Sequence, residues 1–151
     1  MLDLKKRWQA DTLDLKPDVL GILIGVNDRG HGVPPDQHGQ VYDKLIADTK
    51  AANPNLKLVL CEPFTVNHLA TTPANGSPNA HIVKRQEIAA KLAAKHGAAP
   101  VHFQKAPDEA CKRAPAAHWI WGDVHPTCSG HQVLADDWER TVRTFWPAKG
   151  G

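Results

Sequence analysis

The chain has 151 residues, of which 42% are hydrophobic and 23% charged, and its formal net charge is +2. This length suits one domain with a single core, and the small charge, without Lys/Arg clusters among aromatic residues, argues against a nucleic-acid-binding surface. The sequence has no apolar run long enough to span a bilayer and no signal-peptide pattern after Met1.

Helical and strand patterns alternate along the whole chain. The expected helices cover approximately residues 2–15, 38–53, 80–96, 107–113 and 128–146. The expected strands are 19–24, 56–61 and 100–103. In the first helix, Leu4, Trp8 and Leu15 are expected on one face, and in the last one, Phe145 is expected to be buried.

The alternation predicts an α/β fold with a parallel sheet and right-handed crossovers. The run 19–24 is almost entirely apolar, as in a strand that is buried on both faces of such a sheet. No repeat, low-complexity tract or linker divides the chain, so we expect a single domain over 1–151. The long loop 62–79 has a length that is typical of functional or mobile loops.

A first polar motif, Gly25-x-Asn27-Asp28, follows the strand 19–24. The carboxyl end of a strand is where parallel α/β sheets bind ligands. Gly25 permits a sharp turn and a close approach to a ligand, and Asn27 offers an amide donor of the kind that stabilises an oxyanion. An isolated Asn-Asp pair after a strand is usually a plain turn, which is the alternative here.

A second motif places a carboxylate and an imidazole two residues apart, in Asp123-x-His125-Pro126. Residues at this spacing do not share a helix face, but a turn brings them together. Asp123 would then accept the Nδ1 proton of His125 and leave Nε2 free as a base. The alternative is a helix entry with a surface histidine, in which Thr127 or Ser129 caps the helix.

In this order, the two motifs resemble the third and fifth blocks of the SGNH (GDSL) hydrolase family. Four further stretches agree with that pattern: 16–18, 52–54, 62–64 and 130–131. The resemblance covers essentially the whole chain and implies a three-layer, flavodoxin-like sandwich around a parallel sheet. It also implies an esterase or lipase that acts on small acyl esters without metal or cofactor.

By the same resemblance, His125 is the general base, Asp123 is its orienting carboxylate and Asn27 is an oxyanion-hole donor. Gly25 and Asp28 belong to the oxyanion or substrate-binding turn. The chain departs from the family in having neither the Gly-Asp-Ser block that carries the nucleophile nor the second block with its oxyanion glycine. We therefore expect a domain truncated at its N-terminus, without the first strand.

Only two serines are present, Ser77 and Ser129. Ser77 lies on the loop that rims the active site in this fold and is the candidate replacement nucleophile, although a plain turn serine fits its Asn-Gly-Ser-Pro context better. Ser129 fits a helix-capping residue better than a nucleophile. The alternative function is therefore a catalytically inactive homologue that acts as a binding or self-associating module.

Loss of the first strand would leave strand 19–24 without a neighbour on one side. Its free N–H and C=O groups would then be able to pair with another chain. We expect a homodimer through this strand, and a two-fold axis would make the pairing antiparallel. The alternative is that the N-terminal helix shields the edge in a monomer.

Four histidines are conceivable metal ligands: His31, His38, His125 and His131. None forms an H-x-x-x-H or H-E-x-x-H pattern, so we expect no metal. Cys128 begins a helix near His125, but a small packed residue is the simpler interpretation. Trp119 and Trp121 either pack in the core or wall a substrate pocket. The three separated cysteines favour a reducing, cytoplasmic compartment.

Overall fold

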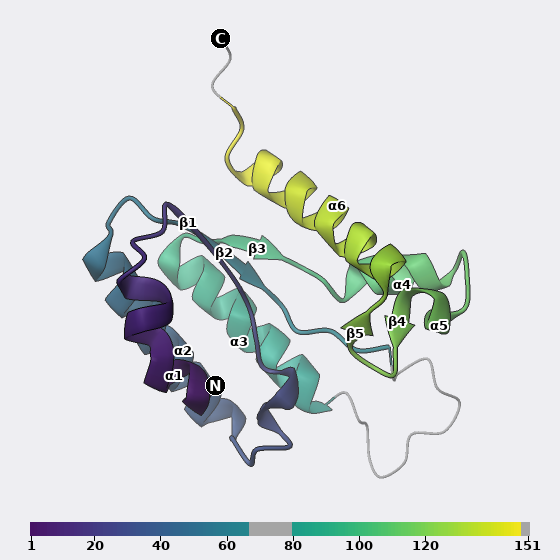
Figure 1. Ribbon diagram of the computed structural model, residues 1–151, viewed down its shortest axis with the longest axis horizontal. Coiled ribbons are helices and arrows are strands. Elements are labelled where there is room, and N and C mark those ends of the chain that lie inside the picture. The colour runs from purple at the N-terminus through teal and green to yellow at the C-terminus, as the bar shows by residue number, and fades with distance from the viewer. Residues whose placement is uncertain (67–79, 149–151) are drawn as a thin grey trace.

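A three-stranded parallel sheet forms the centre of the computed structural model, which describes residues 1–66 and 80–148. The strands, in their spatial order, are β1 (Val19–Leu23), β2 (Lys57–Cys61) and β3 (Ala99–Val101). Val19 pairs with Lys57, and Val59 pairs with Ala99. Helices lie on both sides of the sheet (Figure 1), so the predicted three-layer α/β architecture is confirmed.

Six α-helices and two shorter helical turns surround this sheet in the described part of the chain. The α-helices are α1 (Leu2–Trp8), α2 (Pro35–Ala52), α3 (Ala80–His96), α4 (Lys105–Cys111), α5 (Ala116–Trp119) and α6 (Cys128–Phe145). A π-helical turn (Gln9–Leu13) continues α1, and a 3-10 turn (Val26–Asp28) follows β1. The short strands β4 (Ile120–Trp121) and β5 (His125–Pro126) pair as an antiparallel hairpin.

Local sequence signals explain several of these boundaries. α2 begins three residues earlier than predicted because Pro35 occupies its first turn, where the missing N–H of proline leaves no hydrogen bond unmade. α3 has the predicted bounds, and Gly97, with φ +64°, follows its end in the left-handed conformation. α6 begins after Thr127, whose hydroxyl accepts a hydrogen bond from the Gly130 amide.

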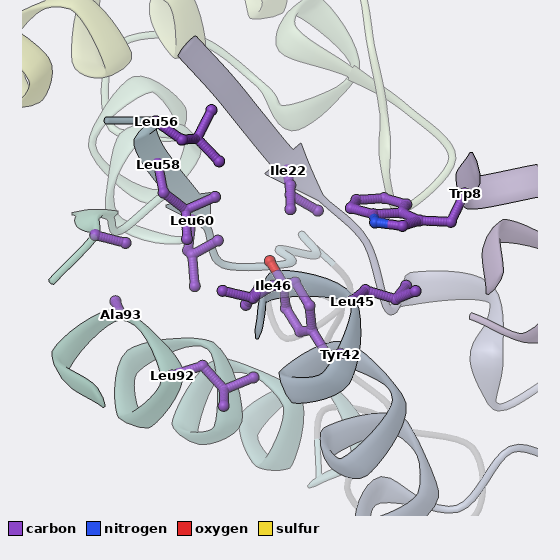
Figure 2. Packing of buried hydrophobic residues seen from close by; sticks show 11 residues of the cluster. Trp8, Ile22, Tyr42, Leu45, Ile46, Leu56, Leu58, Leu60, Leu92 and Ala93 are labelled. Atoms are coloured by element: carbon purple, nitrogen blue, oxygen red, sulfur yellow. The ribbon is translucent and has the colours of Figure 1, made fainter. Parts of the chain in front are cut away.

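The main core lies between the sheet and the helices α1, α2 and α3 (Figure 2). Its buried side chains include Trp8, Ile22, Tyr42, Leu45, Ile46, Leu56, Leu58, Leu60 and Leu92. The indole N–H of Trp8 donates to Thr49 Oγ1 at 3.0 Å, which fixes α1 on α2. A second core, with Val59, Phe64, Val101, Phe103, Ile120 and Leu134, fills the space between the sheet and α6.

Three predictions about helix faces and burial are wrong, each for a physical reason. Leu15 is exposed because the wide π-helical turn rotates the residues that follow it away from the face of Leu4 and Trp8. β1 is buried on one face only: Ile22 is buried, whereas Val19 and Leu23 are 47% and 44% exposed. Phe145 is exposed because the end of α6 extends beyond the sheet (Figure 1).

Candidate functional site

A cleft of about 330 Å³ opens at the carboxyl end of β1. Its lining residues come from the β1 end, the segment after β2 and the hairpin: Met1, Leu23, Ile24, Gly25, Val26, Asn27, Asp28, Phe64, Val124 and His125. Asn27 and His125, which are far apart in sequence, thus line one cleft at the sheet edge where parallel α/β proteins bind ligands. The predicted placement of these two residues is confirmed.

The turn that carries Asn27 depends on Gly25. This glycine has φ +114°, a conformation that residues with side chains rarely adopt. A Cβ atom at this position would lie 3.0 Å from Cδ of Arg85 and 3.1 Å from Cε1 of His38. Both the backbone conformation and the packing therefore require glycine one residue before the 3-10 turn.

The next carboxylate, Asp28, is buried in a network of donors. His38 Nδ1 lies 2.6 Å from Asp28 Oδ2, and the α-amino group of Met1 lies 2.7 Å from Oδ1. Arg85 Nε is 3.9 Å from Oδ2. These contacts use both carboxylate oxygens, so Asp28 holds the Asn27 turn in place from behind.

Protonation states follow from this arrangement. Burial acts to raise the pKa of Asp28, but the hydrogen bonds from the Met1 amino group and His38 outweigh it and bring the pKa below its ordinary value. Burial lowers the pKa of His38, and the hydrogen bond to Asp28 only partly opposes this effect. At neutral pH, Asp28 is therefore ionised, and a neutral His38 donates its Nδ1 proton to it.

Arg85 connects this network to α3. Its Nη2 donates to the carbonyl oxygen of Val33 at 2.6 Å, and its Nη1 donates to the carbonyl oxygen of His81 at 2.9 Å. Arg85 is fully buried, and burial lowers the pKa of its guanidinium. Sequence reasoning missed this residue, but a signal was present: Arg85 shares the apolar face of α3 with Ile82, Ala89 and Leu92.

The hairpin β4–β5 presents His125 to the cleft. Trp121 pairs with His125, and Gly122 turns the chain with φ +57°. The amide of Val66 donates to the carbonyl oxygen of Asp123 at 3.0 Å, which ties the hairpin tip to the segment after β2. At its base, the Thr127 amide donates to the Trp119 carbonyl oxygen at 2.8 Å.

The predicted hydrogen bond between Asp123 and His125 is absent from the contacts of the described residues, and this prediction is wrong. Asp123 lies at the exposed tip of a three-residue turn, where its carboxylate meets solvent rather than the imidazole. The buried carboxylate–imidazole pair of this structure is instead Asp28 with His38, a histidine that sequence reasoning had weighed only as a metal ligand.

The other candidates lie elsewhere. Trp121 is exposed and is not part of the cleft wall, whereas Trp119 is half-buried and donates its indole N–H to the Ala114 carbonyl oxygen. Cys128 is a free, exposed cysteine at the start of α6, and Ser129 follows it on the first turn. Ser77 lies outside the described residues.

The cleft has no hydroxyl or thiol group among its described lining residues. Within residues 1–66 and 80–148, no group of three or more His, Cys, Asp or Glu side chains is arranged to hold a metal ion. The helices of the same ranges include none that is both long and apolar enough to cross a membrane. The polar side chains among the described lining residues are therefore the imidazole of His125, the amide of Asn27 and the buried carboxylate of Asp28, which the Met1 amino group contacts.

Comparison with known proteins gives consistent matches. The profile of the GDSL-like lipase/acylhydrolase family matches residues 1–133. An acetylxylan esterase from Geobacillus stearothermophilus is 28% identical over 155 residues, which cover 95% of this chain and 68% of the esterase. A crystal structure assigned to a GDSL-like lipase from Parabacteroides merdae is 34% identical to this chain, with a TM-score of 0.84. The match covers 93% of this chain and 66% of the lipase chain.

The solved structure of Axe2, an acetylxylan esterase from Geobacillus stearothermophilus, has 26% identity and a TM-score of 0.79, covering 93% of this chain and 66% of Axe2. Solved catalytic mutants of Axe2 replace a serine, an aspartate and a histidine, and the last two are three positions apart in that enzyme. The present chain thus spans about two thirds of the length of these relatives.

Proposed function

We propose that this chain, which belongs to the GDSL-like lipase/acylhydrolase family, hydrolyses small acyl esters in the cleft that Asn27 and His125 line. The observation that carries the proposal is the placement of an imidazole and an amide donor at the carboxyl end of β1. The relatives named acetylxylan esterase make acetyl esters of xylo-oligosaccharides the first substrates to test.

In the proposed reaction, His125 acts as the general base. It takes a proton from a water molecule as the water oxygen attacks the ester carbonyl carbon. The Asn27 amide donates a hydrogen bond to the oxyanion of the resulting tetrahedral intermediate. When the intermediate collapses, the imidazolium returns the proton to the leaving alkoxide, so that one ester and one water give one acid and one alcohol.

Two features of the chain predict a low rate. No described residue of the cleft supplies a nucleophile, so the proposed route lacks the covalent intermediate that makes hydrolysis fast in serine esterases. In Axe2, the mutated aspartate stands three positions before the mutated histidine. The residue three positions before His125 in this chain is Gly122, so Asp123 does not occupy the equivalent position. Asp123 contributes only a solvent-screened attraction for the imidazolium of His125.

The same observations favour one second candidate function, a non-catalytic member of the family. A cleft that keeps the base and the oxyanion donor but has no hydroxyl or thiol among its described lining residues would bind an acyl ester without turning it over. The two candidates differ in one measurable property, which is the release of product.

The deciding experiment measures release of p-nitrophenol from p-nitrophenyl acetate and of acetate from acetylated xylo-oligosaccharides. We expect slow turnover that falls roughly 100-fold in His125→Ala, because general-base catalysis typically contributes 10²–10⁴. His118→Ala is the matched control, since His118 is also an exposed histidine but does not line the cleft. Turnover that His125→Ala leaves unchanged would refute the assigned base, and no turnover above the solvent rate would select the non-catalytic candidate.

A further inference from the structure

We propose that Trp121 forms a sugar-stacking subsite beside the candidate active site and holds the pyranose ring whose acetyl ester enters the cleft. This inference rests on the proposed function and deepens it, because it names the part of the substrate that the chain recognises. All five tryptophans lie in the described residues, and four of them are buried or half-buried. Trp121 is the exception, since it is 68% exposed.

The register of the hairpin β4–β5 puts this indole next to the proposed base. Trp121 pairs directly with His125. Directly opposed residues of an antiparallel pair project from the same face, with Cβ atoms about 4.5–5.5 Å apart. Because His125 lines the cleft and Trp121 does not, the indole stands beside the rim of the cleft. A substrate whose ester reaches His125 therefore brings the group attached to that ester past Trp121.

The other face of the hairpin explains why Trp121 points to solvent. Ile120 pairs with Pro126, and successive residues of a strand alternate between its two faces. Ile120 is buried in the second core, between the sheet and α6. The strand β4 thus attaches the hairpin to the protein through Ile120 and presents Trp121 on the opposite face, together with His125.

Both ends of the hairpin are fixed, which holds the indole and the imidazole in one arrangement. At the base, the Thr127 hydroxyl donates to the carbonyl oxygen of His118 at 2.8 Å. At the tip, the carbonyl oxygen of Asp123 accepts a hydrogen bond from the Val66 amide at 3.0 Å. A subsite whose backbone is already ordered loses little conformational entropy when a ligand binds, and this favours affinity.

A xylopyranose ring has the chemistry that this platform would recognise. Its substituents are equatorial in the β-linked chair, so C–H bonds cover both faces of the ring, and a flat apolar face stacks on an indole. Asp123, exposed in the turn that follows Trp121, carries a carboxylate that only accepts hydrogen bonds, and sugar hydroxyls donate them. An apolar platform next to such an acceptor distinguishes a sugar ester from a simple alkyl ester.

Ester selectivity tests this subsite in the 151-residue chain. The quantity to measure is the ratio of kcat/KM for acetylated xylotriose to kcat/KM for ethyl acetate, which has no ring, with acetate release followed for both. Trp121→Ala should lower this ratio roughly 10-fold, and Trp121→Phe should retain most of it because an aromatic ring remains. Phe145→Ala is the matched control, since Phe145 is also an exposed aromatic residue but lies at the end of α6 and does not line the cleft.

Binding of xylotriose, which carries no ester, tests the subsite independently of catalysis. Millimolar xylotriose should shift the tryptophan emission to shorter wavelength and reduce its quenching by acrylamide, because the exposed indole of Trp121 becomes covered. Both effects should disappear in Trp121→Ala and persist in Phe145→Ala. An unchanged ester ratio in Trp121→Ala, a xylotriose response that survives this substitution, or no response in the unmodified chain would overturn the inference. If neither ester is turned over, ester hydrolysis is refuted, and the xylotriose response alone decides the subsite.

Discussion

His38 Nδ1 lies 2.6 Å from Asp28 Oδ2, immediately behind the turn that carries Asn27. Both side chains are almost completely buried, and Arg85 approaches the same carboxylate from α3. The turn that carries Asn27, the proposed oxyanion donor, is thus supported by a charged network that includes residues of α2 and α3. Stability measurements should therefore report on the site even when no substrate is present.

The first prediction concerns pH. Burial lowers the pKa of His38 in the folded state below the 6.5 of the unfolded chain, so the unfolded state binds more protons just below pH 6.5. The contribution of neutral His38 to the free energy of unfolding is complete above pH 6.5. It decreases as the pH drops below that value, by up to about 1.4 kcal/mol per pH unit for one proton.

Urea unfolding between pH 7.5 and 5.5 measures this slope. We expect His38→Gln to be less stable at pH 7.5 but to have a flatter pH dependence than the unmodified chain. His118→Gln, at an exposed position, should retain the original slope. A slope that is the same in the unmodified chain and in His38→Gln would show that His38 is not the group responsible.

The second prediction concerns Gly130, at the start of α6. A Cβ atom on this residue would overlap the carbonyl oxygen of Trp119, the last residue of α5, which directly precedes the hairpin. We expect Gly130→Ala to lower the free energy of unfolding by about 1–3 kcal/mol and to displace His125. Thermal unfolding and the esterase assay would both detect the change.

Gly39 in α2 provides the control for that substitution. It is also a helical glycine, but its Cβ would make ordinary contact with Ile88 at 3.4 Å. Gly39→Ala should raise stability by about 0.5–1 kcal/mol through helix propensity. Equal effects of the two substitutions would contradict the steric argument at Gly130.

The third prediction concerns Tyr42, whose hydroxyl is buried and has no hydrogen-bond partner among the described residues. Burial also raises the pKa of this hydroxyl well above its ordinary value. Tyr42→Phe removes a desolvated polar group, so we expect stability to stay equal or to rise by up to about 1 kcal/mol.

Trp8→Phe is the contrasting variant, because the Trp8 indole has a partner in Thr49 Oγ1 at 3.0 Å. Its loss should lower stability by about 1–3 kcal/mol, since a hydrogen bond is lost and a smaller ring leaves a cavity. Denaturant unfolding of both variants checks the pair of expectations. A destabilised Tyr42→Phe protein would mean that the hydroxyl has a partner after all.

The fourth prediction concerns the missing orienting carboxylate. Gly122 stands three residues before His125, has φ +57°, and has open space where a side chain would project. Aspartate and asparagine are the residues with side chains that best tolerate this conformation. Gly122→Asp should increase ester hydrolysis several-fold, because a carboxylate that bonds His125 stabilises the imidazolium. Gly122→Asn, with the same shape and no charge, should not.

Periodicity in the sequence correctly predicted the elements that are both long and strongly patterned. α3 and α6 have almost the predicted bounds, and the parallel sheet follows from the alternation of strands and helices. The hairpin β4–β5 was missed because each strand has only two residues, which is too short for any period to appear. Short elements of this kind depend on tertiary contacts, here the hydrogen bond from the Val66 amide to the carbonyl oxygen of Asp123.

The candidate site was predicted in part. Motif order placed Asn27 and His125 at one cleft: Asn27 follows the carboxyl end of β1, where parallel sheets bind ligands, and the β4–β5 hairpin presents His125 to the same edge. The support behind the site was not predicted, since His38 and Arg85 reach Asp28 from helices whose relative placement depends on the whole fold. A sequence pattern identifies a polar residue on a buried face but not the atom that it meets there.

The Asp28–His38–Arg85 network also constrains how this sequence can diverge. Replacement of Asp28 alone would leave a buried guanidinium without its counter-charge, and replacement of Arg85 alone would leave the carbonyl oxygen of Val33 without its buried donor. Each single change is therefore costly, whereas a joint change to apolar residues removes the need for all three. Homologous sequences should accordingly keep or lose these positions together, and this covariation should survive even in lineages in which His125 has been lost.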